Sequence, residues 1–222
     1  RPDAILPNLG GQNGLNLCAL LYKQGVLNRN GVKILGTPVR AITNSEDRVA
    51  FKKILTDLRI ETVPSEACYG IDEALACAKR MGYPVILRPA YTMSGAGGGI
   101  VYSDDELVEV FTRGLKASLI GQVLVEQSLH GWQEVELEIL RDEQNHMITV
   151  GAVENVDPVG IHTGDSLCVS PMMTIPKDVQ GVLQQTAYTI MEAMNVTGSM
   201  TVQFAYDRHT GRIVVIEGNM LA

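Results

Sequence analysis

Apolar positions recur along the chain with two periods, one typical of strands and the other of helices. Residues 4–7 and 33–35 form short apolar runs, and residues 12–24 between them repeat with the period of an amphipathic helix. This order predicts a strand–helix–strand layer of the nucleotide-binding type. Because no element precedes residue 4, we expect the layer to lack its first strands.

The central residues continue the alternation of helices and strands. Thr43 is followed three residues later by Glu46, and this capping-box pattern predicts a helix that runs from Thr43 to about Leu58. Two further helices are predicted over residues 72–81, ended by Gly82, and 104–116, with Asp104 as N-cap, and strands over residues 85–88, 100–102 and 123–126.

The C-terminal half is dominated by paired strands. Residues 133–141 and 146–156 predict a long antiparallel pair, and a helix over 177–194 separates it from a final hairpin, 200–206 with 212–217. The whole pattern indicates α/β or α+β architecture. We place the domain boundary within residues 42–46, so that residues 1–43 form a partial first domain and residues 44–222 the second.

Composition narrows the class of protein mainly by exclusion. The 222 residues suffice for one or two domains, and a net charge of −7 without a basic stripe argues against a nucleic-acid surface. No apolar run approaches the roughly 20 residues of a membrane span, and no signal-peptide pattern opens the chain. The cysteines have no metal-like spacing, so we assign structural roles to Cys18, Cys68, Cys77 and Cys168 in a cytosolic protein.

A glycine-rich segment, Ser94 to Gly99, is the most informative stretch for chemistry. Its glycines allow the backbone to approach a ligand and to point N–H groups at oxygen atoms, and Arg88 just before it supplies a fork for phosphate. The spacing matches neither the P-loop nor the dinucleotide fingerprint. Taken alone, the segment is equally consistent with a mobile turn between two strands.

Polar residues also alternate along two predicted strands. Glu134, Glu136 and Glu138 share one face of the strand over 133–141, and we expect at least one of them to be solvated, although such carboxylates could also bind ribose or a cation.

In the final hairpin, a pair between Asp207 and Ile213 would set Gln203 opposite Glu217, with Asn219 on the same face. Such oxygen ligands suit Mg²⁺, but a half-exposed hairpin is the alternative. A second glycine-flanked polar loop, residues 160–166, has a composition that does not reveal its chemistry.

Several of these segments together resemble one family. The runs RPDAILPNLGGQ at 1–12, RPAYTMSGAGGGI at 88–100, SLHGWQE at 128–134 and GIHTGDS at 160–166 stand in the same order in the large subunit of carbamoyl-phosphate synthase, in its N-terminal synthetase half. The resemblance implies an ATP-grasp fold, incomplete at its C-terminal end and preceded by the end of a Rossmann-like pre-ATP-grasp domain. It further implies a ligase that phosphorylates bicarbonate with ATP, with ammonia from a glutaminase small subunit, for arginine and pyrimidine biosynthesis in the cytoplasm.

The resemblance also implies roles for individual residues. Catalytic roles fall to Arg88, Glu217 and Asn219, and two Mg²⁺ or Mn²⁺ ions to Gln203, Glu217 and Asn219. A potassium ion is implied at Asn155, Glu134, Glu217 and Ser166. The ATP-binding positions are Arg48, Arg88, Ser94, Gly95, Gln127, Leu129, Glu134, Gly160, Ile161, His162, Gln203 and Glu217.

The sequence departs from the family pattern at three places. Ser94 replaces a glycine, Gln127 replaces an acidic residue, and Met220 and Leu221 follow Asn219 where the family reads E-x-N-P-R. The arginine that ends this family motif is absent here, and in the family it would be expected to stabilise charge near the transferred phosphoryl group. We therefore expect a chain truncated at both ends, and we keep two alternatives: an inactive fragment that binds nucleotide or a partner subunit, the rest of the large subunit included, and another ATP-grasp ligase such as a biotin carboxylase.

Overall fold

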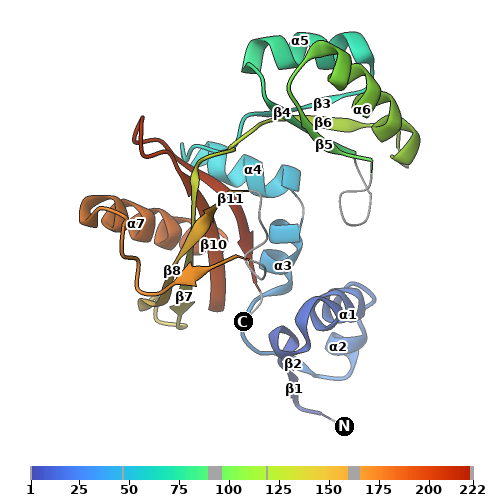
Figure 1. The fold of residues 1–222 in the computed structure, drawn as a ribbon. Coiled ribbons are helices and arrows are strands. Elements are labelled where there is room, and N and C mark those ends of the chain that lie inside the picture. The colour runs from blue at the N-terminus through green and yellow to red at the C-terminus, as the bar shows by residue number, and fades with distance from the viewer. Residues whose placement is uncertain (1, 47, 90–96, 119, 160–165, 221–222) are drawn as a thin grey trace. The chain divides into compact units, whose positions relative to one another are not determined.

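The computed structural model describes residues 2–46, 48–89, 97–118, 120–159 and 166–220, with the backbone alone at residues 12, 43–46, 48 and 49 (Figure 1). The chain forms two compact units. The larger unit contains residues 1–62 and 131–222, and the smaller unit contains residues 63–130. Each unit has a hydrophobic core of its own.

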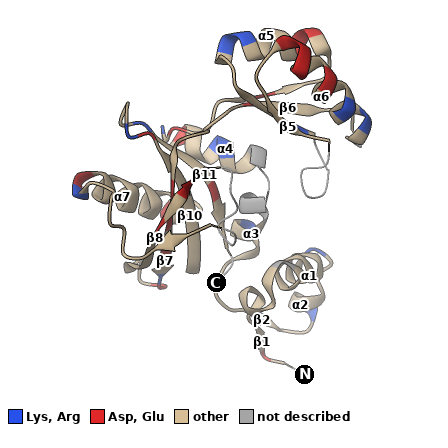
Figure 2. Cartoon of the chain, in the orientation of Figure 1, with Lys and Arg blue, Asp and Glu red and all other residues tan. Residues whose placement is uncertain are grey.

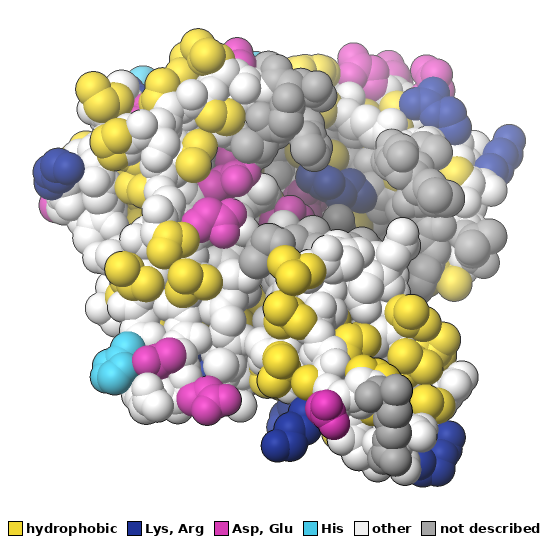
Figure 3. Space-filling view, turned by 90° about the horizontal axis from the view of Figure 1, so that it is seen from below, with side chains coloured by type: hydrophobic (Ala, Val, Ile, Leu, Met, Phe, Trp, Pro, Cys, Tyr) yellow, Lys and Arg dark blue, Asp and Glu magenta, His cyan; other side chains and the backbone are white. Residues whose placement is uncertain are grey.

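The first residues of the larger unit form the strand–helix–strand layer that the sequence predicts. Strands β1 (Ala4–Ile5) and β2 (Lys33–Ile34) pair in parallel, and the 3₁₀ turn η1 (Pro7–Gly10) and helices α1 (Gly11–Lys23) and α2 (Val26–Arg29) connect them. Leu15 and Cys18 of α1 are fully buried. Six large hydrophobic side chains of these elements remain exposed: Leu6, Leu9, Leu17, Leu20, Tyr22 and Leu35. Figure 3 shows hydrophobic side chains at the surface of the face that it draws.

Helix α3 (Val39–Glu46) begins four residues before the predicted N-cap, so the capping role assigned to Thr43 is wrong. The helix follows Pro38, whose carbonyl accepts hydrogen bonds from the N–H groups of Ala41 and Ile42. Proline suits a helix start because its φ angle is already helical. Burial of Ala41 and Ile42 then fixes the first turns against the core. The proposed boundary after residue 43 falls inside α3 and stays a prediction.

A five-stranded antiparallel sheet forms the body of the larger unit. Its strand order is β11 (Ile213–Asn219), β10 (Gly198–Tyr206), β7 (Gln133–Arg141), β8 (Met147–Pro158) and β9 (Cys168–Val169). Helix α7 (Lys177–Ala193) packs on one face, and helix α4 (Arg48–Asp57) contributes to the same core. The apolar core between the sheet and these helices includes Val135, Leu137, Ile139, Val202, Phe204, Leu183, Ile190 and Leu55. The opposite face carries the acidic side chains of β7, together with the exposed apolar pair Leu140 and Ile148.

The smaller unit is a four-stranded antiparallel sheet with two helices on one face. The strand order is β3 (Ser65–Cys68), β6 (Val123–Gln127), β4 (Val85–Pro89) and β5 (Gly99–Val101), and helices α5 (Ile71–Met81) and α6 (Asp104–Ala117) pack on the sheet (Figure 1). Val85, Leu87, Val123 and Val125 face the helices and are buried. The other face of β4 and β6 carries the charged residues of interest below.

The N-cap of α6 is Ser103 and not Asp104 as predicted, because the Ser103 hydroxyl accepts a hydrogen bond of 3.3 Å from the Glu106 N–H. Asp104 instead accepts a hydrogen bond of 2.8 Å from the Tyr83 hydroxyl. That hydrogen bond lowers the pKa of Asp104, and burial together with the same bond raises the pKa of Tyr83.

Ser103→Ala should therefore destabilise the chain by about 1 kcal/mol, since the α6 N-terminus loses its side-chain cap. The matched control is Asp105→Ala in the same turn, an exposed position where a change within about 0.5 kcal/mol is expected. The measurement is the urea midpoint followed by far-UV circular dichroism. Equal midpoints for Ser103→Ala and the control would contradict the assignment of the cap.

Two smaller expectations concern membranes and thiols. None of the helices in the described residues is long and apolar enough to cross a membrane. Cys18, Cys68 and Cys77 are buried as expected, and burial raises the pKa of Cys68 to about 12. Cys168 differs because it is only half-buried, and its thiol contacts Asn155 Oδ1 at 3.0 Å.

Candidate functional site

The polar face of the five-stranded sheet brings together the acidic residues that the sequence singled out. Glu134, Glu136 and Glu138 alternate along β7 with core residues, and Figure 2 shows acidic residues on strands of this sheet. Glu134 is 7% exposed, and the other two are half-buried. Glu136 and Glu138 thus keep part of their surface in solvent, as expected for at least one of the three carboxylates, whereas Glu134 is buried.

Glu136, Gln203 and Glu217 form one row across three strands. Gln203 of β10 lies directly opposite Glu136 of β7 on one side and Glu217 of β11 on the other. Its Nε2 donates a hydrogen bond of 2.7 Å to Glu136 Oε1. Gln203 and Glu217 are both half-buried, so the row is sheltered without being sealed from solvent.

The predicted neighbours Gln203 and Glu217 are correct, although the predicted register is not. Ile213 pairs with Tyr206 and not with Asp207, which alone would shift the strand by one residue. A register irregularity between Gln203 and Phe204 restores the alignment, so that Gln203 meets Glu217. A bulge of this kind inserts one extra residue in one strand and redirects the side chains beyond it.

A second row, Glu138, Thr201 and Asn219, lies beside the first. The Thr201 hydroxyl donates a hydrogen bond of 2.6 Å to Glu138, and Thr201 pairs with Asn219 of β11. Asn219 Nδ2 donates a hydrogen bond of 2.9 Å to Glu217 Oε1. The Asn219 amide therefore points its nitrogen at the Glu217 carboxylate and keeps its Oδ1 atom for another partner.

Three oxygen atoms of these rows are suited to a hard divalent ion. They are Oε1 of Gln203, Oε2 of Glu217 and Oδ1 of Asn219, none of which accepts a hydrogen bond from another described residue. Carboxylate and amide oxygens are the ligands that Mg²⁺ takes in proteins. Among the residues that the structure describes, no group of three or more His, Cys, Asp and Glu side chains is arranged to hold a metal ion. The candidate set depends instead on two amides and one carboxylate.

Strand β8 contains a buried carboxylate that the sequence analysis missed. Glu154 is 2% exposed, and its carboxylate accepts hydrogen bonds of 2.9 Å from the N–H groups of Met173 and Thr174 and further bonds from Gln133 and the Thr174 hydroxyl. Burial opposes ionisation, but these donors outweigh it and lower the pKa of Glu154. The residue therefore fastens β8 to the segment that leads into α7.

Asn155, the next residue of β8, points to the other face by the two-residue period of a strand. It is 1% exposed, and its Nδ2 has no hydrogen-bond partner among the described residues. Ser166 Oγ lies 3.6 Å from Cys168 Sγ, which in turn contacts Asn155. Asn155 and Ser166 are thus both in contact with the Cys168 thiol, and their role as potassium ligands stays a prediction.

The smaller unit holds another part of the candidate set. Arg88 lies on the β4 face away from α5 and α6, and its Nε lies 3.1 Å from Glu126 Oε1 of β6. The Arg88 side chain is 47% exposed, so its guanidinium remains accessible to an anion. Gln127 follows Glu126, and its N–H donates to the Pro64 carbonyl, whereas Leu129 is 5% exposed. Sequence reasoning missed Glu126 because nothing in the sequence shows which strands pair.

Several predicted residues lie outside the described residues. These are Ser94, Gly95, Gly160, Ile161 and His162, and for Arg48 the backbone alone is described, at the start of α4. The glycine-rich segment is described from Gly97 onward. Gly97 has a φ of 81°, and a Cβ atom there would lie 2.9 Å from the Ala117 side chain of α6. Glycine is thus required at residue 97 by conformation and by space.

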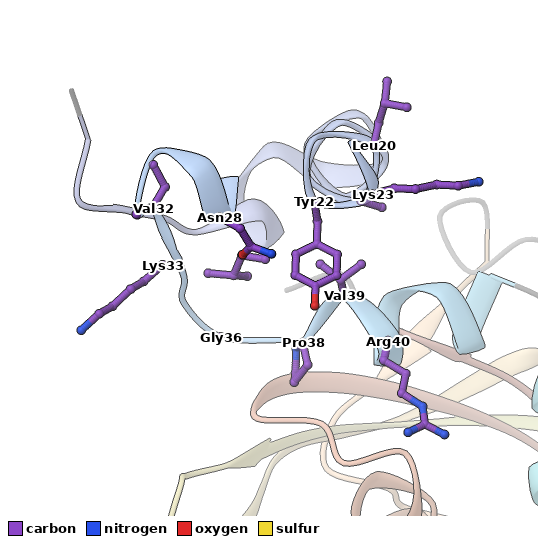
Figure 4. A pocket seen from close by; sticks show the side chains of 13 residues that line it. Leu20, Tyr22, Lys23, Asn28, Val32, Lys33, Gly36, Pro38, Val39 and Arg40 are labelled. Atoms are coloured by element: carbon purple, nitrogen blue, oxygen red, sulfur yellow. The ribbon is translucent and has the colours of Figure 1, made fainter. Parts of the chain in front are cut away.

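A separate hollow of about 1270 Å³ lies beside α1, α2 and β2 of the larger unit (Figure 4). Tyr22 points from α1 toward Pro38 and Val39, and the lining includes Leu20 and Val32. None of the candidate residues named above lines this hollow. It is mainly apolar and offers no carboxylate, so it is distinct from the polar face of the sheet.

Two sequence families match the chain. The family described as carbamoyl-phosphate synthase L chain, ATP binding domain, matches residues 47–221, and the carbamoyl phosphate synthase preATP-grasp domain matches residues 1–44. The carbamoyl phosphate synthase large chain of Clostridium perfringens (strain SM101 / Type A) is 44% identical over 219 residues, which are 99% of this chain and 20% of the relative. That of Thermoanaerobacter sp. (strain X514) is 43% identical over the same share. The chain thus spans about a fifth of the length of these curated relatives.

Two solved structures with the same fold are described as nucleotide complexes. A biotin carboxylase from Campylobacter jejuni in a β,γ-ATP complex has a TM-score of 0.77 at 22% identity and covers 99% of this chain and 49% of its own. The biotin carboxylase domain of Hydrogenobacter thermophilus 2-oxoglutarate carboxylase, with MgADP, ADP and bicarbonate, has a TM-score of 0.77 at 21% identity, covering 99% and 48%. At these identities the likeness shows the ATP-grasp fold alone, which confirms the predicted fold class.

Proposed function

The chain belongs to the family of carbamoyl-phosphate synthase large chains, and from that premise we propose that it binds ATP and phosphorylates bicarbonate to carboxyphosphate. The observation that carries the proposal is the oxygen set of Gln203, Glu217 and Asn219 on one sheet face, with the amide nitrogens turned toward carboxylates. A solved relative in fold is described with MgADP and bicarbonate together.

The roles of individual residues follow the resemblance. Arg48 and Arg88 contact the phosphates, with Ser94 and Gly95 in the loop that covers them, and Arg88, Glu217 and Asn219 serve the reaction itself. The adenosine is bound by Gln127, Leu129, Glu134, Gly160, Ile161 and His162. Gln203, Glu217 and Asn219 hold two Mg²⁺ or Mn²⁺ ions, and Asn155, Glu134, Glu217 and Ser166 a potassium ion.

The donor set fits a divalent ion because all three atoms are oxygens and only one of them carries a full charge. When bound, such ions would neutralise phosphate charge, which is the main requirement of phosphoryl transfer. The protein itself positions the charged side chains. Arg88 Nε lies 3.1 Å from Glu126 Oε1, and Asn219 Nδ2 donates a hydrogen bond of 2.9 Å to Glu217 Oε1. Preorganised charges of this kind stabilise the transition state without rearrangement.

The wider setting belongs to the same proposal. We place this chain with the domains that its relatives carry beyond the matched fifth of their length, with residues 1–43 as pre-ATP-grasp and residues 44–222 as ATP-grasp domain. Ammonia from a glutaminase small subunit would then convert carboxyphosphate to carbamate, in the cytoplasm, for arginine and pyrimidine biosynthesis.

A second candidate function is nucleotide or partner-subunit binding without turnover. Met220 and Leu221 favour it, because they stand where the family resemblance places a proline and the arginine expected near the transferred phosphoryl group. The third candidate is another ATP-grasp ligase of the biotin carboxylase type. The chain is only 22% and 21% identical to the two biotin carboxylase structures above. The 44% identity to carbamoyl phosphate synthase large chains argues against it.

An ADP-release assay on the 222-residue chain separates these functions. ADP release that depends on bicarbonate supports the first proposal, and release that depends on biotin and bicarbonate together supports the third. Nucleotide binding without any ADP release supports the second. A chain that neither binds nucleotide nor releases ADP would contradict the first and the third, and would leave only partner-subunit binding from the second.

A further inference from the structure

We propose that Glu136 is a positioning residue that orients the Gln203 amide so that its oxygen, and not its nitrogen, faces the metal ion. The inference rests on the proposed function, because it concerns the metal site of Gln203, Glu217 and Asn219. It adds a residue that is not itself assigned as a ligand. The carrying observation is the bond of 2.7 Å from Gln203 Nε2 to Glu136 Oε1.

The Gln203 side chain lies between two carboxylates that compete for its amide nitrogen. The strand register places Glu136 directly opposite on β7 and Glu217 directly opposite on β11. The nitrogen bonds to Glu136, while the Glu217 carboxylate accepts a hydrogen bond from Asn219 Nδ2. Each amide of the metal set is therefore committed to a carboxylate through its nitrogen, and the two oxygens are left toward the ion.

The orientation matters because the two ends of an amide are opposite in function. The oxygen is an acceptor and a good ligand for a hard cation, whereas the NH₂ group is a donor only and repels a cation. Without Glu136, the Gln203 nitrogen would turn to the remaining carboxylate, Glu217. That single rotation would remove one ligand oxygen and also occupy a Glu217 oxygen.

The neighbouring row provides a natural comparison. Glu138 is bonded to the Thr201 hydroxyl at 2.6 Å, and Thr201 is not in the metal set. Glu138 and Glu136 lie two residues apart on the same face of β7, and both are half-buried. They therefore bring similar charge to the same region, but only Glu136 orients a proposed ligand.

The test uses Glu136→Asp, which keeps the charge but shortens the side chain by one methylene and so breaks the 2.7 Å bond. The readout is the dissociation constant of Mn²⁺ in the presence of a non-hydrolysable ATP analogue, followed by the electron paramagnetic resonance signal of free Mn²⁺. We expect binding to weaken about tenfold, the value of a hydrogen bond to a charged group. Glu138→Asp is the matched control, with a change within about twofold.

A reciprocal exchange of the two side chains provides the rescue. Glu136→Gln alone should weaken Mn²⁺ binding, because two facing amides can bond in either orientation. In the double variant E136Q/Q203E, the amide now on β7 can donate to the carboxylate now on β10, whose second oxygen faces the ion. Mn²⁺ binding should return to within about threefold of wild type, because an oriented, charge-assisted hydrogen bond is restored.

The outcomes separate this inference from the proposed function. If wild type binds no Mn²⁺–nucleotide complex, the proposed function fails and this inference fails with it. If wild type binds, Glu217→Gln binds much more weakly, and Glu136→Asp matches wild type, the inference alone is overturned. Equal weakening by Glu138→Asp, or a double variant no better than Glu136→Gln, would also overturn it, since charge or sheet packing would then be the cause. Thermal midpoints of all variants establish that each is folded.

Discussion

A Glu217→Gln chain is expected to bind the Mg²⁺ complex of a non-hydrolysable ATP analogue about a hundredfold more weakly than wild type, as loss of a metal-site interaction typically costs. Glu217 is the one carboxylate among the three proposed ligands, so its replacement removes the negative charge that the ion requires. The new amide would also face Asn219 Nδ2, whose present bond to Glu217 Oε1 measures 2.9 Å. Calorimetric titration of both chains measures the difference.

The control for this variant is Glu61→Gln. Glu61 forms an exposed ion pair with Arg212 at the opposite end of β11. The Glu61→Gln substitution therefore removes one negative charge, as Glu217→Gln does, but far from the proposed ligands. Binding within about twofold of wild type is expected for it. In the full-length large chain, Glu217→Gln should abolish bicarbonate-dependent ATP hydrolysis. Near-normal binding by the Glu217→Gln chain would remove Glu217 from the metal set.

The second large effect concerns stability. Glu154→Ala should destabilise the chain by about 3 kcal/mol, because the N–H groups of Met173 and Thr174 and the Gln133 amide lose their shared acceptor. The Arg208 guanidinium, 3.5 Å from Glu154, also loses its partner, but it is half exposed and water can replace the contact. Urea unfolding measures the change, and Glu143→Ala in the exposed turn between β7 and β8 is the control. A midpoint equal to that of the control would contradict the role of Glu154.

The same residue predicts a dependence on pH. The folded chain lowers the pKa of Glu154 below its ordinary value of 4.5, so ionised Glu154 stabilises the fold above that pH. This stabilisation is lost as the pH falls below 4.5 through the lowered pKa. Between pH 4.5 and the lowered pKa of Glu154, the free energy of unfolding should fall more steeply with decreasing pH for wild type than for Glu154→Ala. Parallel curves for the two chains would show that Glu154 does not contribute to the acid dependence.

Elements with strong local signals could be predicted from the sequence. The helix predicted over 72–81 is α5 (Ile71–Met81), and that over 177–194 is α7 (Lys177–Ala193). Strands β3 and β9 were missed, because only two of the four residues of Ser65–Cys68 are apolar and Cys168–Val169 has two residues. Strand β3 forms by pairing with β6, and β9 forms by pairing with β8. These two strands therefore depend on pairing with distant residues and not on a local sequence pattern.

The candidate site shows the same division between local and distant information. The alternation of Glu134, Glu136 and Glu138 was visible, but the partners of these carboxylates were not. Gln203 lies 67 residues from Glu136 and Arg88 lies 38 residues from Glu126, and no local period connects such positions. The neighbours Gln203 and Glu217 were predicted from a register that was wrong by one residue, and the irregularity next to Phe204 made the pair correct.

The most direct measurement is a calorimetric titration of the wild-type chain with a non-hydrolysable ATP analogue, first with Mg²⁺ and then with EDTA. A nucleotide site with Gln203, Glu217 and Asn219 as metal ligands predicts saturable one-to-one binding that is at least about tenfold tighter with Mg²⁺. The absence of binding under both conditions, or binding of equal strength with and without Mg²⁺, would contradict it.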